Sequence, residues 1–288
     1  MTEIIKNNEK ANKSLKYLGY ATVGKLDEVI LAELKEKSIE LIKETQKTYP
    51  KGELYNLINA NKVLKDKSNN MVRDYFLPTL EKYLNIDKVE IYPVSHIIKP
   101  FGFKSDIWHQ DSSVVDDAKH FALNAWIPLV DSTKLNGCLW VFPGSHINTN
   151  YHRQFGFNPV EGSFLKKLKP YLKPITAKAG EILLFDRSLL HGSSNNYLPY
   201  PRIAVEALVT SKNAQMYNYH RDENLFKDKI IGFKVDSSHF LKENPKEDFY
   251  SGETPYELID DITKEEMVTN LSADFPKFIA HAQKIEQC

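Results

Sequence analysis

The chain has 288 residues, of which 42% are hydrophobic and 11% aromatic, so it can bury a sizeable core as one large domain. Its 38 basic and 38 acidic residues leave no net charge. This balance argues against a general nucleic-acid or membrane-surface binder, because both normally carry a basic excess. Cys138 and Cys288 are the only cysteines, so neither a disulfide framework nor a structural zinc site is encoded.

The first ten residues do not resemble a secretory signal, and no later segment is apolar for long enough to span a bilayer. We therefore expect a cytoplasmic protein, monomeric or homodimeric, that acts on a small molecule and binds neither nucleic acid nor a membrane. We expect one domain over 1–288, with a helical part at about 1–87, a β core at about 88–210 and a C-terminal extension at about 211–288.

Two helices are predicted in the N-terminal part. Between residues 27 and 49, apolar side chains at helical spacing form one face opposite Glu and Lys, and Pro50 ends the pattern. A second helical pattern covers residues 71–84. Pro78 interrupts it, which predicts a kinked or split helix.

From residue 89 onward, short apolar runs alternate with Gly- and Pro-containing turns, which predicts antiparallel β structure rather than a parallel βαβ sheet. In the run 89–99, alternation places His96 on the same face as Tyr92. In the run 121–129, Asn124 and Trp126 share one face and three apolar residues share the other. A polar and aromatic face is typical of an interior that holds a ligand.

The C-terminal extension is rich in Tyr, Phe and charged residues. Its segment 263–266 reads Thr-Lys-Glu-Glu, a capping box that predicts the start of a helix. We expect helices that pack on the β core or cover its mouth.

A candidate metal site comes from two separate motifs. His109 and Asp111 stand two residues apart, so on an extended segment both side chains point to the same side. His191 follows a predicted strand at 181–185, and Arg202 opens another. Two imidazoles and one carboxylate can hold one face of an octahedral iron and leave the opposite face open. A lone His-x-Asp is common by chance, but the ordered set that includes His191 and Arg202 is much less so.

The run 89–209 resembles the phytanoyl-CoA dioxygenase family of Fe(II)/2-oxoglutarate oxygenases. The resemblance is carried, in the family's order, by Trp-His-Gln-Asp at 108–111, Ala-Trp-Ile-Pro-Leu at 125–129, Asn-Gly-Cys-Leu at 136–139, Val-Phe-Pro-Gly-Ser-His at 141–146 and His-Gly-Ser at 191–193. It implies a mainly β fold, a double-stranded β-helix (jelly roll, cupin-like) with flanking helices in the N- and C-terminal parts.

The resemblance also implies roles for individual residues. His109, Asp111 and His191 would bind Fe(II), Arg202 and Ser193 would bind the distal carboxylate of 2-oxoglutarate, and Trp126 would line that pocket. With O₂, such an enzyme hydroxylates a C–H bond and releases succinate and CO₂. His96 and Tyr92 are weaker candidates for the other end of 2-oxoglutarate. Charged loop residues such as Arg153 are expected to be solvated.

Two other functions remain open at this point. The chain could be a non-catalytic binding module, or a cupin-like hydrolase or isomerase that uses zinc or manganese. Arg202 and Ser193 favour the oxygenase, because neither alternative needs a dicarboxylate site. Within the oxygenase class the substrate could be a small metabolite, such as an amino acid or a specialised metabolite, or an acyl group tethered to a carrier or to CoA. We favour the small metabolite.

Overall fold

The computed structural model describes residues 3–49, 56–103, 108–147, 151–154, 166–221, 229–241, 256–261 and 276. The helical elements are α1 (Glu9–Leu18), α2 (Glu28–Thr48), η2 (Leu57–Asn59), α3 (Lys62–Met71), the π-helical η3 (Val72–Phe76), α4 (Leu77–Tyr83), η4 (Lys169–Tyr171) and η5 (Ser237–Leu241). The strands are β1 (Tyr20–Lys25), β2 (Val89–Lys99), β3 (Ala122–Pro128), β4 (Leu139–Val141), β5 (Lys173–Ile175), β6 (Glu181–Asp186), β7 (His191–Ser193), β8 (Arg202–Ser211), β9 (Met216–His220), β10 (Lys229–Val235) and β11 (Tyr256–Asp260).

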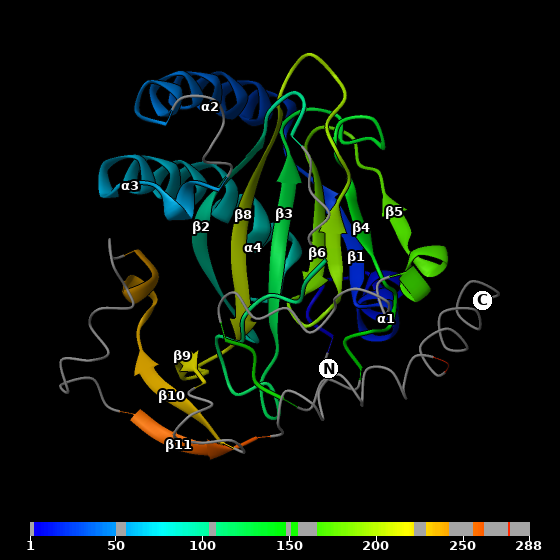
Figure 1. Ribbon diagram of the computed structural model, residues 1–288, viewed down its shortest axis with the longest axis vertical. Helices are drawn as coiled ribbons and strands as arrows, with labels where there is room; N and C mark the ends of the chain where they lie inside the picture. Colours follow the sequence, from blue (N-terminus) through cyan, green and yellow to red (C-terminus); the bar gives the residue numbers. More distant parts are fainter. Residues whose placement is uncertain are drawn as a thin grey trace.

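Two antiparallel sheets form the β core. The larger has the strand order β1-β6-β3-β8-β2 and the smaller has the order β5-β4-β7 (Figure 1). Trp126 and Leu183 of the larger sheet pack with Leu139 and Val141 of the smaller one in a single apolar cluster. The sheets therefore face each other, although the described strands do not close into a barrel.

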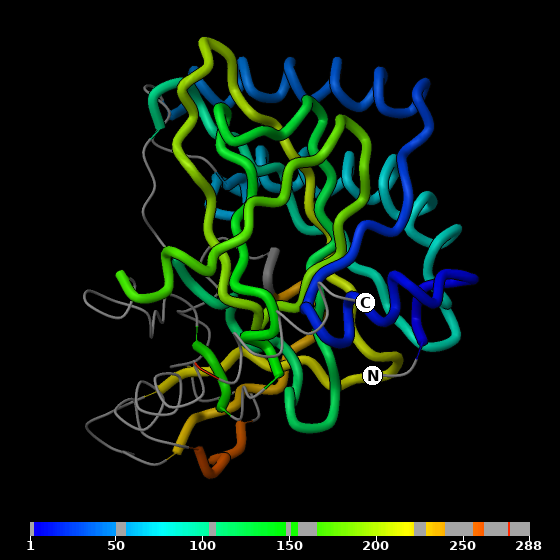
Figure 2. The backbone as a smooth tube through the Cα atoms, turned by 90° about the vertical axis from the view of Figure 1, so that its right-hand side faces the viewer, coloured from blue at the N-terminus to red at the C-terminus, as the bar shows by residue number. Residues whose placement is uncertain are grey.

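Helices α2, α3 and α4 cover the outer face of the larger sheet, and the rotated view shows α2 and α3 running alongside one another (Figure 2). Leu123, Ala125 and Ile127 of β3 pack with Leu34 and other residues of these helices. Trp126, by contrast, lies in the apolar cluster between the two sheets. The two-faced pattern expected for residues 121–129 is thus confirmed. No helix in the described part of the chain is both long and apolar enough to cross a membrane.

The helix boundaries have local causes. The Asp27 carboxylate accepts a hydrogen bond from the Val29 amide at 2.9 Å and caps the start of α2. Pro78 stands in the first turn of α4, where its missing N–H costs least. The helical run is not broken at Pro78, because α3, the π-helical η3 and α4 follow one another directly, and it begins earlier than expected, at Lys62.

Two regions differ from the expectation. The N-terminal part contains α1 and the edge strand β1, which pairs with β6. Gly19 ends α1 with a φ of 85°, which reverses the chain into that strand. In the C-terminal part, the described residues include the sheet β11-β10-β9 and the short η5, which the sequence pattern did not indicate. Segment 263–266 lies outside the described residues.

Candidate metal and cosubstrate site

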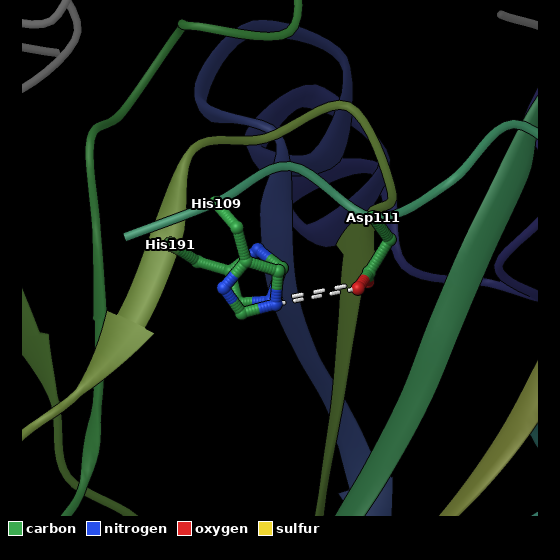
Figure 3. Close-up of side chains that lie close together, drawn as sticks. All are labelled: His109, Asp111 and His191. Atoms are coloured by element: carbon green, nitrogen blue, oxygen red, sulfur yellow. Dashed lines mark ion pairs between the residues drawn. The ribbon is translucent and has the colours of Figure 1, made fainter. Parts of the chain in front are cut away.

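His109, Asp111 and His191 lie together between the two sheets (Figure 3). His191 belongs to β7 of the smaller sheet, while Asp111 accepts a hydrogen bond from Asn124 of β3 in the larger one. The Nε2 atoms of His109 and His191 are 3.5 Å and 3.8 Å from the carboxylate oxygens of Asp111. One donor atom from each residue fits within 4.8 Å of the other two, which is close enough for a single metal ion.

Backbone pairing holds the two histidines in place. The His109 amide donates to the His191 carbonyl, and the His191 amide donates to the His109 carbonyl, both at 2.9 Å. Gln110 points away, as expected from the alternation, and its amide group donates to the backbone carbonyl of Ser188. His109 and Asp111 therefore share the side that faces His191.

The ring of His191 is prepared for a metal at Nε2. Its Nδ1 lies 2.9 Å from the backbone carbonyl of Leu189, and only an N–H can satisfy that contact. Burial, followed by the nearby His109, lowers the pKa of His191 to about 4. The ring is thus neutral at pH 7 and directs the Nε2 lone pair toward Asp111.

Asp111 is held in its ionised form. Burial alone would raise its pKa, but the charge of the Arg187 guanidinium is the main influence that holds that pKa well below its usual range. Asn124 donates to Asp111 Oδ2 and accepts a 2.6 Å hydrogen bond from Arg187. Asn124 therefore links the carboxylate to a cation and fixes its orientation.

A basic region lies on the inner face of the larger sheet. Lys99 of β2 and Arg202 of β8 are register partners, and they are only 3% and 4% exposed. Lys99 Nζ donates to Ser193 Oγ and to the Ser194 carbonyl, both at 2.6 Å. The Arg202 guanidinium carbon lies 5.3 Å from the Trp126 ring centre, and none of the described residues accepts a hydrogen bond from its Nε.

These two cations are held together against their mutual repulsion. Burial lowers the pKa of Lys99 to about 7, and the charge of Arg202 contributes to the same shift. Burial also lowers the pKa of Arg202 to about 10. No salt bridge joins either cation to a carboxylate within the described ranges. A buried pair of like charges next to a hydroxyl is suited to an external anion, and a carboxylate matches the fork of a guanidinium.

His96 does not reach this region, which corrects the expectation that it contacts the cosubstrate. The register of β2 against β8 shifts between Pro93 and Ser95, and this bulge inverts the alternation of side chains. His96 consequently faces the helices and hydrogen-bonds to Ser38 of α2 and Ser68 of α3, each at 2.8 Å.

Two other charged residues differ from the expectation or were missed. Arg153 is buried rather than solvated, and its Nε donates to the Asp111 carbonyl at 2.8 Å. Glu206 was not singled out, although it stands on β8 four residues after Arg202 and so on the same face. A charged residue inside an otherwise apolar strand was the signal that could have identified it.

A comparison with protein families gives one match. The model of the family described as phytanoyl-CoA dioxygenase (PhyH) matches residues 32–204.

Curated proteins with similar sequences include two kinds of dioxygenase. The chain is 31% identical over 116 residues to phytanoyl-CoA dioxygenase 1 of Oryza sativa subsp. japonica, a match that covers 38% of this chain and 41% of that protein. It is 31% identical over 156 residues to the ectoine dioxygenase of Sphingopyxis alaskensis, covering 46% of this chain and 50% of that protein. The chain thus spans half or less of the length of these relatives.

Solved structures show the same fold at low sequence identity. The non-heme alpha ketoglutarate dependent carbocyclase SnoK from nogalamycin biosynthesis superimposes with a TM-score of 0.53 at 16% identity, over 73% of this chain and 87% of that one. The epimerase SnoN, in complex with Fe3+, alpha ketoglutarate and nogalamycin RO, superimposes with a TM-score of 0.52 at 19% identity. That match covers 72% of this chain and 85% of the SnoN chain. These likenesses confirm the expected jelly-roll core.

Proposed function

This chain belongs to the phytanoyl-CoA dioxygenase family, and we propose that it is an Fe(II)- and 2-oxoglutarate-dependent dioxygenase. It would hydroxylate an unactivated C–H bond of a small molecule and release succinate and CO₂. The observation that carries this proposal is the proximity of a His-Asp-His cluster to a buried pair of cations.

The donor set fits iron. Two neutral imidazoles and an ionised carboxylate occupy one side of an ion and leave the other side open for further ligands. His109, Asp111 and His191 offer that set within 4.8 Å. When bound, Fe(II) supplies the activation of O₂, which no protein side chain can provide.

The basic region fits 2-oxoglutarate. Ser193 connects the two parts of the site, because it stands two residues after His191 on β7 and accepts a hydrogen bond from Lys99. A dicarboxylic acid can therefore reach Arg202 and Lys99 with its distal carboxylate while its other end points toward the triad. Trp126 packs against the Arg202 guanidinium and excludes water from that end.

The chain's own residues then have separate tasks. Arg187 and Asn124 keep Asp111 ionised and oriented, and the Leu189 carbonyl keeps the proton of His191 on Nδ1. The inner face of the sheets shields the reacting bond from water.

Arg202 and Lys99 separate this function from a zinc or manganese hydrolase with the same three ligands. Such a hydrolase needs no dicarboxylic acid, so the two buried cations would have no purpose in it. A non-catalytic module would likewise gain nothing from an ionised Asp111 beside the neutral imidazole of His191.

The test is anaerobic reconstitution with Fe(II) and 2-oxoglutarate. We expect about one iron per chain and a visible absorption band that requires both components. His191→Ala should lose the band and all substrate-stimulated formation of succinate, while the protein stays folded because an open catalytic site contributes little to folding.

His120→Ala is the matched control, since His120 lies outside the triad and should keep the band. A zinc-loaded hydrolase with no iron and 2-oxoglutarate band would contradict the proposal. Full activity of His191→Ala would contradict the ligand assignment.

A further inference from the structure

A second carboxylate, that of Glu206, shares the inner face of the larger sheet with Arg202. Glu206 stands opposite Trp126 in the pairing of β3 with β8. Its strand neighbours Val205 and Ala207 are completely buried on the helix side, whereas Glu206 stays partly exposed. Because β8 is covered by β3 and β2 along both edges, the exposed part of Glu206 can only face the space between the sheets.

Within the described ranges no cation pairs directly with Glu206, although the charges of Arg187 and Arg202 partly offset the effect of its burial. Glu206 forms neither a hydrogen bond nor a salt bridge with a described residue. The guanidinium of Arg187 forms its hydrogen bonds with other residues, since it donates to Asn124 at 2.6 Å and to the Ser112 carbonyl at 3.1 Å. Arg202 is four residues away along the same strand, a separation of about 13 Å between Cα atoms.

The surroundings of Glu206 combine apolar side chains with the charged groups around the triad, since Asp111 and Arg187 both act on it electrostatically. Trp126 lies across from it, and Ala204 and Leu208 are its neighbours on the same face. Burial, followed by the charge of Asp111, raises the pKa of Glu206 to about 7.

We infer that Glu206 binds a protonated nitrogen of the substrate, which is therefore a small organic cation with an amine, amidine or guanidine group. This inference rests on the proposed function and names its substrate class. A desolvated carboxylate gains most from a charged donor, because charge-assisted hydrogen bonds are about twice as strong as neutral ones.

The same feature argues against a thioester substrate. The acyl chain of a CoA or carrier conjugate is apolar near the C–H bond that reacts. Such a chain would cover Glu206 without offering it a hydrogen bond, and burying a carboxyl group without a hydrogen-bond partner is costly. A small cation removes that cost and places its C–H bonds beside the triad.

The test uses the anaerobic Fe(II) and 2-oxoglutarate complex and two sets of compounds. The cationic set is cadaverine, agmatine, L-lysine and L-arginine. The other set is 1-hexanol, hexanamide, hexanoate and hexanoyl-CoA. Two readouts are recorded, namely a change in the absorption band on binding and succinate formation after O₂ is admitted. We expect cationic compounds alone to change both.

The matched variants are Glu206→Gln and Glu40→Gln. Glu206→Gln keeps the shape of the side chain but removes its charge, so the concentration of the active cation that half-saturates the band change should rise at least about 10-fold. Its affinity for 2-oxoglutarate should stay close to the original. Glu40→Gln changes an exposed residue of α2 and should behave like the original protein.

The outcomes separate the two proposals. Absence of the iron and 2-oxoglutarate band overturns the proposed function itself. If the band forms but no cationic compound changes it, or if hexanoyl-CoA does, the inference about Glu206 is wrong. It is also wrong if Glu206→Gln binds the active cation as tightly as the original protein. Because that variant must still show the band, a failure to fold cannot be mistaken for a loss of recognition.

Discussion

Lys99 and Arg202 face one another across the β2–β8 pair, and both are almost completely buried. Two cations in this position destabilise each other until an anion lies between them. The free protein therefore holds two buried like charges in contact, and either the loss of the Lys99 proton or the binding of an anion relieves their repulsion.

The first prediction concerns Arg202. Arg202→Leu should weaken 2-oxoglutarate binding by at least about 100-fold, because breaking a desolvated charge pair costs about 3–5 kcal/mol. Arg202→Lys should recover only part of the affinity, since an ammonium cannot reproduce the fork of donors. The measurement is an anaerobic titration of the absorption band with 2-oxoglutarate. Arg73→Leu, at an exposed site on η3, is the control, and an unchanged affinity in Arg202→Leu would remove Arg202 from the site.

The second prediction is a pH dependence of 2-oxoglutarate binding. Burial lowers the pKa of Lys99 to about 7 in the free protein, and a bound carboxylate raises it again. Binding therefore takes up a proton above pH 7. The affinity should be constant below that pH and fall as pH rises from 7 toward the higher pKa of the complex. Titrations with 2-oxoglutarate between pH 6 and 9 measure how the affinity depends on pH, and Lys99→Met should abolish this dependence. If the affinity of that variant depended on pH as steeply as that of the original protein, another group would take up the proton.

The third prediction concerns Asn124, which links Asp111 to Arg187. Asn124→Ala should weaken iron binding by about 10- to 100-fold, the usual effect of losing a residue that orients a metal ligand. Iron affinity is measured by competition with a chelator. Asn70→Ala, on the exposed side of α3, serves as the control. Asn124 would have no orienting role if the affinity stayed unchanged.

The fourth prediction concerns acid stability. The Ser38 hydroxyl donates to the Leu34 carbonyl at 2.6 Å, so it accepts from His96 Nε2, while Ser68 donates to Nδ1. This network satisfies the neutral ring, and burial lowers the pKa of His96 to about 3.

In the unfolded chain the pKa of this histidine lies near its ordinary value of about 6.5. Between these two values the unfolded state binds more protons, so stability is lost as pH falls from 6.5 toward 3. The contribution of His96 is at most about 1.4 kcal/mol for each pH unit. The free energy of unfolding, measured with urea at several pH values, should depend less steeply on pH in His96→Gln than in the original protein. Parallel slopes would show that His96 does not titrate in this range.

Much of this molecule can be predicted from its sequence where local rules act alone. Asp27 caps the start of α2, and Pro78 stands in the first turn of α4, because capping and the missing proline N–H are local effects. The bounds of β2 were predicted correctly, yet the side of His96 was not, because the bulge is set by pairing with β8. The surroundings of Glu206 could not be predicted from its own strand either, since only the pairing of β8 with β3 places Trp126 beside it.

The backbone bridge between residues 109 and 191 separates the framework of the site from its chemistry. The two amides and two carbonyls that join these positions belong to the main chain, so their spacing is the same whichever side chains they carry. Exchanging an imidazole for another donor should therefore change the ion that the site prefers and leave both backbone segments where they are. This part of the fold is accordingly a ready scaffold for redesigned metal chemistry, with ligand identity as the adjustable component.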